Sequence, residues 1–195
     1  MYKKRGIALP LRLATVFGAF ATLLLFVVAC APSADFAPGS STPLTAFDEA
    51  EVRVAVSLER TQSGDFLLSA TFTPLRAGFH LYSKDIPAKG IDGVGRPTLL
   101  ALPADSPLQA SGPLTENLAP QTPPVDPREL LIYPAGPVIL SLPVKLPAGD
   151  KSQKIEILIT YMSCNGTTCL RPVIQKAVSV QVPGADQIPP LESLP

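Results

Sequence analysis

The stretch Val52-Arg53-Val54-Ala55-Val56-Ser57-Leu58-Glu59 (residues 52–59) decides the fold class of this 195-residue chain. Its large aliphatic side chains recur at every second position and alternate with smaller, polar or charged ones. Successive side chains of a β-strand point to opposite faces, so this period predicts a strand with one buried face. A Ser-Gly-Asp turn at 63–65 then leads into a second apolar segment, 66–72, which we expect to be the next strand.

Five further segments have the same character, because each is short, rich in β-branched or aromatic residues and bounded by Pro, Gly or Asp. They are 78–83, 98–102, 138–144, 155–162 and 173–182. About seven short strands, with no convincing helical period, predict an all-β fold, an immunoglobulin-like antiparallel β-sandwich. A β-barrel is the structural alternative. The high proline content of the chain, 23 residues, agrees with the sandwich, since proline is excluded from strand and helix interiors and collects in connections.

Between these strands, the segment 104–137 is rich in proline and has little hydrophobic period. Loops of this length in compact domains are usually functional or disordered, and we predict a long ordered excursion across the sandwich. The β domain is expected to occupy residues 48–183. Residues 184–195 are expected to form a loose C-terminal tail.

The N-terminus has the features of an export signal. An apolar stretch at 13–28 has the length of a signal-peptide core and is short for a membrane span. It ends in Val-Val-Ala-Cys at 27–30, which resembles the lipobox of bacterial lipoprotein signals. Residues 1–29 are therefore predicted to be removed and Cys30 to carry a lipid; an ordinary secretory signal or an uncleaved anchor, with Cys30 incidental, is the alternative. The basic residues of the leader are Lys3, Lys4, Arg5 and Arg12.

The Pro- and Ser-rich segment after the lipidated cysteine is predicted to be a flexible linker, so that residues 30–47 hold the domain away from a bilayer. The predicted location is the outer face of a bacterial cytoplasmic membrane, or a membrane facing the periplasm. The leader contains four of the sixteen basic residues and none of the sixteen acidic ones, so the mature chain has a net charge of −4. This balance gives no reason to expect nucleic acid or anionic lipid as a partner.

Two cysteines, Cys164 and Cys169, remain once Cys30 carries a lipid, and an even pair is typical of an oxidising compartment. They flank Asn-Gly at 165–166, a strong hairpin signal between two strand patterns. A four-residue loop at 165–168 would place the cysteines directly opposite each other. A two-residue turn would place them diagonally, too far apart for an unstrained disulfide. Either arrangement makes the pair local and accessible.

From these residues alone, a redox function and a structural staple stay open. A disulfide that closes a six-residue loop stabilises a fold by only about 2 kcal/mol, and local exposed disulfides are often labile or catalytic. Metal binding is least expected because the pair has no neighbouring histidine or carboxylate in the sequence, and no cofactor is expected. The sequence gives little support for a hydrolase or transferase function, because it has no Gly-x-Ser-x-Gly motif, no phosphate-binding glycine loop and a single histidine.

Around the cysteine pair, the sequence resembles a known family. The segment 161–172, YMSCNGTTCLRP, has an aromatic residue, a closely spaced Cys pair, an apolar residue and a proline. Upstream, AGFHLYS at 77–83, Pro-Thr at 97–98 before an apolar strand, and the strand at 137–144 follow in the same order. Over about residues 48–183, the chain resembles the N-terminal domain of the DsbD family of thiol:disulfide interchange proteins.

The resemblance implies an immunoglobulin-like sandwich that performs dithiol–disulfide exchange, with Cys164 and Cys169 as the exchanging pair. The implied partners are a membrane-embedded electron donor and exported thioredoxin-like or other disulfide-containing proteins. The residues that would line the site are His80, Tyr82 and Tyr161.

The resemblance also implies a cap loop over the cysteines, with its counterpart at 125–133. This segment offers Leu130 and Leu131 where the family commonly has an aromatic residue, and its acids are Asp126 and Glu129. Arg171 stands where a second proline is common; turned inward, it would favour a thiolate, whereas on a strand surface it would be solvated.

Two hypotheses follow from the sequence. The first is a lipid-anchored redox relay, a component of a thiol:disulfide oxidoreductase system, which would take its electrons from a separate membrane partner. The second is a non-redox immunoglobulin-like binding lipoprotein that recognises a peptide, protein or glycan through the proline-rich excursion, with a structural disulfide.

Overall fold

The computed structural model describes residues 41–147 and 149–189. The predicted signal peptide at 1–29, the lipidation residue Cys30 and the linker up to residue 40 lie outside the described residues. Within the described ranges, no helix is long and apolar enough to cross a membrane.

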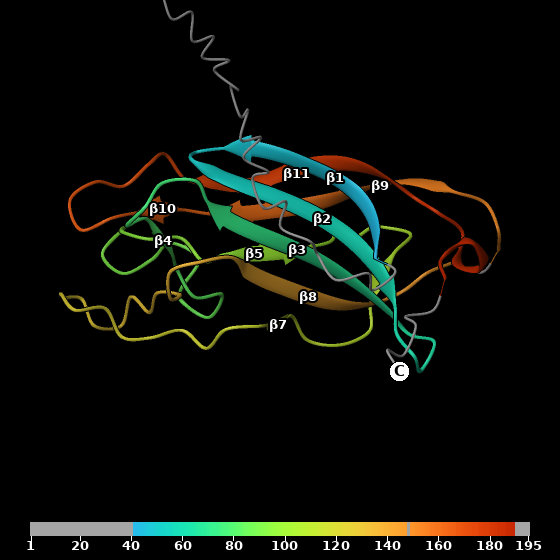
Figure 1. Ribbon diagram of the computed structural model, residues 1–195, viewed down its shortest axis with the longest axis horizontal. Helices are drawn as coiled ribbons and strands as arrows, with labels where there is room; N and C mark the ends of the chain where they lie inside the picture. Colours follow the sequence, from blue (N-terminus) through green and yellow to red (C-terminus); the bar gives the residue numbers. More distant parts are fainter. Residues whose placement is uncertain (1–40, 148, 190–195) are drawn as a thin grey trace, which may run out of the picture. The chain divides into compact units, whose positions relative to one another are not determined.

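The larger of the two main sheets contains four long antiparallel strands in the order β1-β2-β3-β8 (Figure 1). Two short strands, β6 and β7, pair with the outer edge of β8. The hairpin from β2 to β3 keeps an unbroken register from Val52–Pro74 to Arg60–Phe66, so the turn at 63–65 lies where the sequence predicted it. The strand bounds are β1 Thr42–Glu49, β2 Val52–Arg60, β3 Phe66–Pro74, β6 Gln109–Ala110, β7 Thr115–Glu116 and β8 Val138–Lys145.

The second main sheet has the antiparallel order β11-β9-β5, and a separate two-stranded ladder pairs β10 with β4. A layer of four long strands that faces a layer of three is the arrangement of immunoglobulin-like sandwiches. The predicted all-β antiparallel sandwich is therefore confirmed. The bounds are β4 His80–Leu81, β5 Leu99–Ala101, β9 Gln153–Tyr161, β10 Ser163–Cys164 and β11 Val173–Val182.

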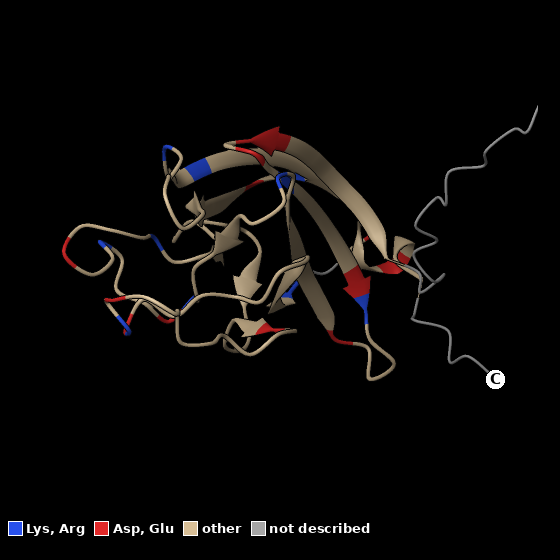
Figure 2. Cartoon of the chain, turned by 60° about the vertical axis from the view of Figure 1, so that its left-hand side comes forward, with Lys and Arg blue, Asp and Glu red and all other residues tan. Residues whose placement is uncertain are grey.

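The core between the two layers follows directly from the alternating pattern of β2. Val52, Val54, Val56 and Leu58 are all buried, and they belong to one hydrophobic core with aliphatic side chains of β8, β9 and β11. Burial of each such side chain stabilises the fold by about 1.5–3 kcal/mol. The charged residues are interspersed along the ribbon, and many lie at strand ends and in connections (Figure 2).

Three features differ from the sequence prediction. β1 begins at Thr42, inside the predicted linker, and pairs with β2 over its whole length. It was not predicted because its sequence, TPLTAFDE, has no period of two. The predicted loose tail begins with a short 3-10 helix, η1 (Ala185–Gln187), and Ile188 is only 1% exposed in the main core. The excursion at 104–137 is ordered as predicted, but it contributes β6 and β7 to the larger sheet.

The cysteine loop and the start of the described chain lie at opposite ends of the sandwich. The β1–β2 turn lies beside the end of β9, where the Tyr161 hydroxyl donates a 2.8 Å hydrogen bond to the Glu49 carbonyl oxygen. The short β4–β10 ladder and the cysteine loop lie at this same end (Figure 1). The described chain starts at the opposite end, where Thr42 pairs with Leu58.

Candidate functional site

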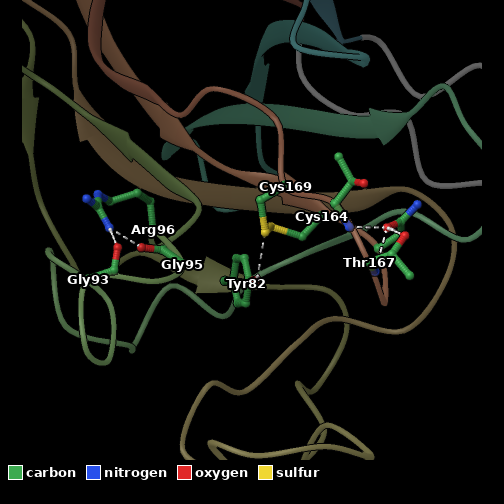
Figure 3. The surroundings of a disulfide bond; sticks show 9 residues. Tyr82, Gly93, Gly95, Arg96, Cys164, Thr167 and Cys169 are labelled. Atoms are coloured by element: carbon green, nitrogen blue, oxygen red, sulfur yellow. Dashed lines mark hydrogen bonds between the residues drawn. A yellow bond between two sulfur atoms is a disulfide. The ribbon is translucent and has the colours of Figure 1, made fainter.

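A four-residue loop brings the two cysteines together. The Asn165 backbone N–H donates a 2.9 Å hydrogen bond to the Thr168 carbonyl oxygen. The Asn165 side-chain Oδ1 accepts from the backbone N–H groups of Thr167 and Thr168, at 2.9 and 2.7 Å (Figure 3). Cys164 and Cys169 therefore face each other across the antiparallel ladder, with Cα atoms 4.1 Å apart, and form a disulfide. Of the two turn geometries considered from the sequence, the structure has the four-residue loop.

The two sulfur-bearing residues lie in unlike surroundings. Cys164 is 1% exposed and belongs to a small apolar cluster, separate from the main core, with Tyr82, Ile86, Leu130 and Ile132. We call this set the site cluster. Cys169 is exposed. An incoming thiol therefore meets Cys169, while Cys164 is shielded.

β4 and the residue that follows it supply the two aromatic residues predicted beside the pair. His80 is the register partner of Cys164 in the β4–β10 ladder, and the His80 and Tyr82 rings meet edge to face with centroids 5.4 Å apart. The Tyr82 hydroxyl lies 3.9 Å from the Cys169 Sγ atom (Figure 3). Because a disulfide sulfur carries no hydrogen, the hydroxyl is the donor in this contact. The structure thus brings His80 and Tyr82 to the disulfide.

The protonation of these two rings follows from their burial. Burial lowers the pKa of His80 from its ordinary value of 6.5, so the imidazole is neutral at pH 7. Burial raises the pKa of Tyr82 above its ordinary value of 10, so the phenol keeps its proton. The site therefore offers a neutral ring and a hydroxyl donor beside the sulfurs, and neither of these groups brings a positive charge.

The segment 125–133 lies against the cysteine pair, in the position expected of a cap. It runs beside β4, because the Ser83 backbone N–H donates to the Leu131 carbonyl oxygen and the Tyr133 N–H donates to the Leu81 carbonyl oxygen, both at 2.9 Å. Leu130 of this segment is buried in the site cluster. We call residues 125–133 the cap segment.

An open groove of about 390 Å³ lies between the cap segment and the cysteine loop. Cys169, His80 and Tyr82 line it, together with the proline-rich run 123–127 and the loop 165–168. Val94 and Val125 line it as well, although they are 45% and 66% exposed to solvent. The exposed cysteine therefore opens into a groove with a largely apolar lining.

Charge is sparse in the groove. Asp126 is the one acidic residue among the described residues that line it, and no Lys or Arg is among them. Glu129 is exposed and does not line the groove. Arg171 is exposed and lines a different hollow beside the β1–β2 turn, so its side chain does not serve the sulfurs. Within the part of the chain that the structure describes, no group of three or more His, Cys, Asp or Glu side chains is placed to hold a metal ion.

Tyr161 does not lie at the disulfide, and its predicted site role is corrected. Its ring is fully buried in the main core and meets Phe72 edge to face, with centroids 5.7 Å apart. Its hydroxyl is used by the Glu49 carbonyl oxygen. Side chains alternate along β9 and β10, so the residue three positions before Cys164 points into the sandwich and not toward the groove.

A second wall of the groove was not predicted from the sequence. The loop 86–96 carries Val94, and Gly95 packs so closely that a Cβ atom there would lie 2.8 Å from Leu130 Cδ2 of the cap segment. Arg96 closes this loop through its guanidinium group, which donates to backbone carbonyl oxygens (Figure 3). Three glycines in six residues, at 90, 93 and 95, were the available signal that the backbone turns tightly here.

A hydrogen-bonded cluster behind the groove was also missed. The Tyr133 hydroxyl donates a 2.6 Å hydrogen bond to Glu116 Oε2 and accepts a 3.1 Å hydrogen bond from the Lys84 backbone N–H. The Lys84 ammonium group lies 3.8 Å from the same carboxylate. This cluster fastens the end of the cap segment to β7 and to the residues that follow β4.

Comparisons with known proteins found no sequence match to this chain and a similarity in structure. No family model matches it, and no curated protein matches its sequence. Among solved structures, it is similar to the N-terminal periplasmic domain of ScsB from Proteus mirabilis, with a TM-score of 0.44 and 15% sequence identity. The similarity covers 74% of this chain and 51% of that one, so the chain spans about half the length of the ScsB domain.

Proposed function

We propose that this protein is a thiol:disulfide exchange domain whose Cys164–Cys169 pair passes two electrons between protein partners. The observation that carries the proposal is the unequal exposure of the two cysteines, one open to a groove and the other buried beside it. A disulfide built only to stabilise the fold gains nothing from such an opening. This disulfide also closes a loop of six residues, which stabilises the fold by only about 2 kcal/mol.

The exchange begins with attack on Cys169. A partner thiolate forms a bond to the Cys169 sulfur, the Cys164–Cys169 bond breaks, and the electron pair leaves on the Cys164 sulfur, which then takes a proton. A second thiolate of the partner then attacks the partner's sulfur in the mixed disulfide and releases the Cys169 sulfur, which takes a proton. The partner is oxidised to a disulfide and this domain gains two electrons and two protons. Reversal of these steps passes the electrons to an oxidised protein.

The neighbours of the sulfurs fit this chemistry. The Tyr82 hydroxyl donates toward Cys169 and would stabilise the negative charge that develops on that sulfur when Cys169 is released from the mixed disulfide. While the disulfide is formed, the neutral imidazole of His80 leaves the groove without a fixed positive charge. Exchange at such a site depends on contact with a partner that supplies the thiolate.

In this proposal, the domain works outside the cytoplasm, tethered to a membrane through a lipid on Cys30. The support is the leader sequence with its lipobox and the disulfide itself, which persists in oxidising compartments. The electron donor would be a membrane-embedded protein, and the acceptors would be exported thioredoxin-like or other disulfide-containing proteins. Palmitate labelling of the wild type and of a Cys30→Ala variant tests the tether, and equal label in both would contradict it.

A redox titration tests the exchange itself. We expect a reduction potential for the Cys164–Cys169 couple near the thioredoxin range, about −270 mV, whereas a structural disulfide would lie below about −300 mV. Trapping then tests the order of attack. A Cys164→Ser variant leaves the exposed Cys169 free and should accumulate mixed disulfides, while Cys169→Ser leaves only the shielded Cys164 and should trap far less. Equal trapping by both variants would contradict the proposed order.

The competing function is a non-redox binding domain with a structural disulfide, and the apolar lining of the groove is the observation that favours it. The same titration separates the two. A couple below about −300 mV, together with no mixed disulfide from either variant, would leave binding as the function of the groove.

A further inference from the structure

The loop 86–96, which we call the Arg96 loop, is an internally braced structure. One guanidinium nitrogen of Arg96 donates to the carbonyl oxygens of Lys89 and Gly93, at 2.9 and 3.0 Å, and to that of Gly95. Ile91 and Val94 exchange a pair of backbone hydrogen bonds of 3.0 and 2.9 Å. The loop is therefore fixed by its own contacts and does not depend on a partner for its shape.

The braced loop also packs against the site cluster and lines the groove. A Cβ atom on Gly95 would lie 3.4 Å from both Tyr82 and Ile86, so the backbone at this point touches the site cluster directly. Ile91 is partly buried against the same cluster. One residue before Gly95, Val94 is 45% exposed and lines the same groove as Cys169.

Exposed apolar side chains are concentrated at this groove. The large hydrophobic residues exposed in the described part of the chain are Leu75, Val94, Val125 and Ile174. Two of these four lie on the groove, one on the Arg96 loop and one on the cap segment. Burial of such side chains under a partner favours binding, and a loop that is already rigid loses less conformational entropy when the partner binds.

We infer that the Arg96 loop is a preformed recognition wall for a protein thiol, with Val94 as a specificity-determining contact and Arg96 as the residue that positions it. This inference rests on the proposed function, because attack on Cys169 brings the atoms around the partner's sulfur into the groove. The occupant is a folded protein that carries apolar residues next to its reactive cysteine. A small dithiol needs only to reach the sulfur, whereas a protein must also fit between the two walls.

The test compares two reductants on the full chain. Reduced thioredoxin serves as the protein probe and dithiothreitol as the small one, and the second-order rate constant for reduction of the disulfide is measured with each. The variants are Val94→Ser, Arg96→Ala and, as a matched control, Ile174→Ser, which removes a side chain that is 57% exposed away from the groove. Because Val94 is exposed, the Val94→Ser variant should fold like the wild type, and a change in its rates then reports on recognition.

We expect Val94→Ser to lower the ratio of the thioredoxin rate to the dithiothreitol rate by about three- to tenfold, and Arg96→Ala to lower it at least as much. Arg96→Ala should also speed amide hydrogen exchange at 89–95, which shows that the brace is lost. Ile174→Ser should keep the wild-type ratio.

Two results would overturn the inference in distinguishable ways. If wild-type protein reacts quickly with thioredoxin and both groove variants keep its ratio, the wall is not a recognition surface, while the exchange function stands. If wild-type protein reacts with thioredoxin no faster than with dithiothreitol, protein exchange fails and the recognition wall fails with it.

Discussion

The hydroxyl group of Tyr133 fastens the end of the cap segment through two hydrogen bonds. The substitution Tyr133→Phe removes this group without changing the shape of the ring. The hydroxyl donates to the Glu116 carboxylate at 2.6 Å and accepts from the Lys84 N–H at 3.1 Å. A hydrogen bond to a charged group contributes about 1.5–3 kcal/mol, and the substitution also leaves the Lys84 N–H without its acceptor. We expect the free energy of unfolding to fall by about 2 kcal/mol, and the melting temperature by about 4–8 °C.

The matched control is Tyr161→Phe, because Tyr161 is equally buried but its hydroxyl makes one hydrogen bond, to the uncharged Glu49 carbonyl oxygen. Loss of a neutral bond costs about 0.5–1.5 kcal/mol, so this variant should be the more stable of the two. Only Tyr133→Phe should also speed reduction of the disulfide by dithiothreitol, because only Tyr133 fastens the cap segment. Urea unfolding and stopped-flow reduction measure both effects. A Tyr133→Phe variant as stable as Tyr161→Phe, with an unchanged reduction rate, would refute the anchoring role.

Three further predictions concern the disulfide, pH and the Arg96 loop. Replacing both Cys164 and Cys169 by alanine should lower the free energy of unfolding in oxidising buffer by about 2 kcal/mol, and a loss above 5 kcal/mol would mark a staple. Burial, together with nearby carboxylates, raises the pKa of Tyr133 and of Tyr161 above 10, so the unfolded chain loses these two protons at a lower pH than the folded one. The contribution of the two phenols to the free energy of unfolding is therefore fully present below pH 10 and should fall above it. In urea titrations, the double Phe variant should show a shallower fall between pH 9 and 11. Gly95→Ala places a Cβ atom against the cap segment at a φ of +79° and should cost about 1–3 kcal/mol by thermal unfolding, so a neutral result would show that the loop yields freely.

The sequence predicted the sandwich well where side-chain alternation was regular. The buried row of β2 and its hairpin to β3 are both as expected, since burial on one face imposes the period. β1 was missed because an edge strand needs no such period; its backbone pairing with β2 is enough to hold it. Ile188 was missed because a single apolar residue after the last strand gives no pattern.

The candidate site was predictable only where one short segment contained it. The spacing of Cys164 and Cys169 limited the loop to two geometries, and the structure has one of them. Tyr161 was misplaced because proximity in sequence does not say which face of a strand a side chain takes. The contribution of Arg96 could not be predicted, since its acceptors are backbone carbonyl oxygens, which any sequence provides.

The place where the chain joins the sandwich has a consequence for electron delivery. β1 runs from Thr42 to the cysteine end over eight residues, a distance of about 25 Å at 3.3 Å per residue. A domain fastened to a bilayer at its Thr42 end would hold Cys169 outward, within easy reach of freely diffusing proteins and turned away from a donor embedded in the same bilayer. In the proposed relay, the domain would have to reorient before a donor in that bilayer could reduce its disulfide. The length and flexibility of the predicted linker would then control how often Cys169 faces the membrane, and so the rate of turnover.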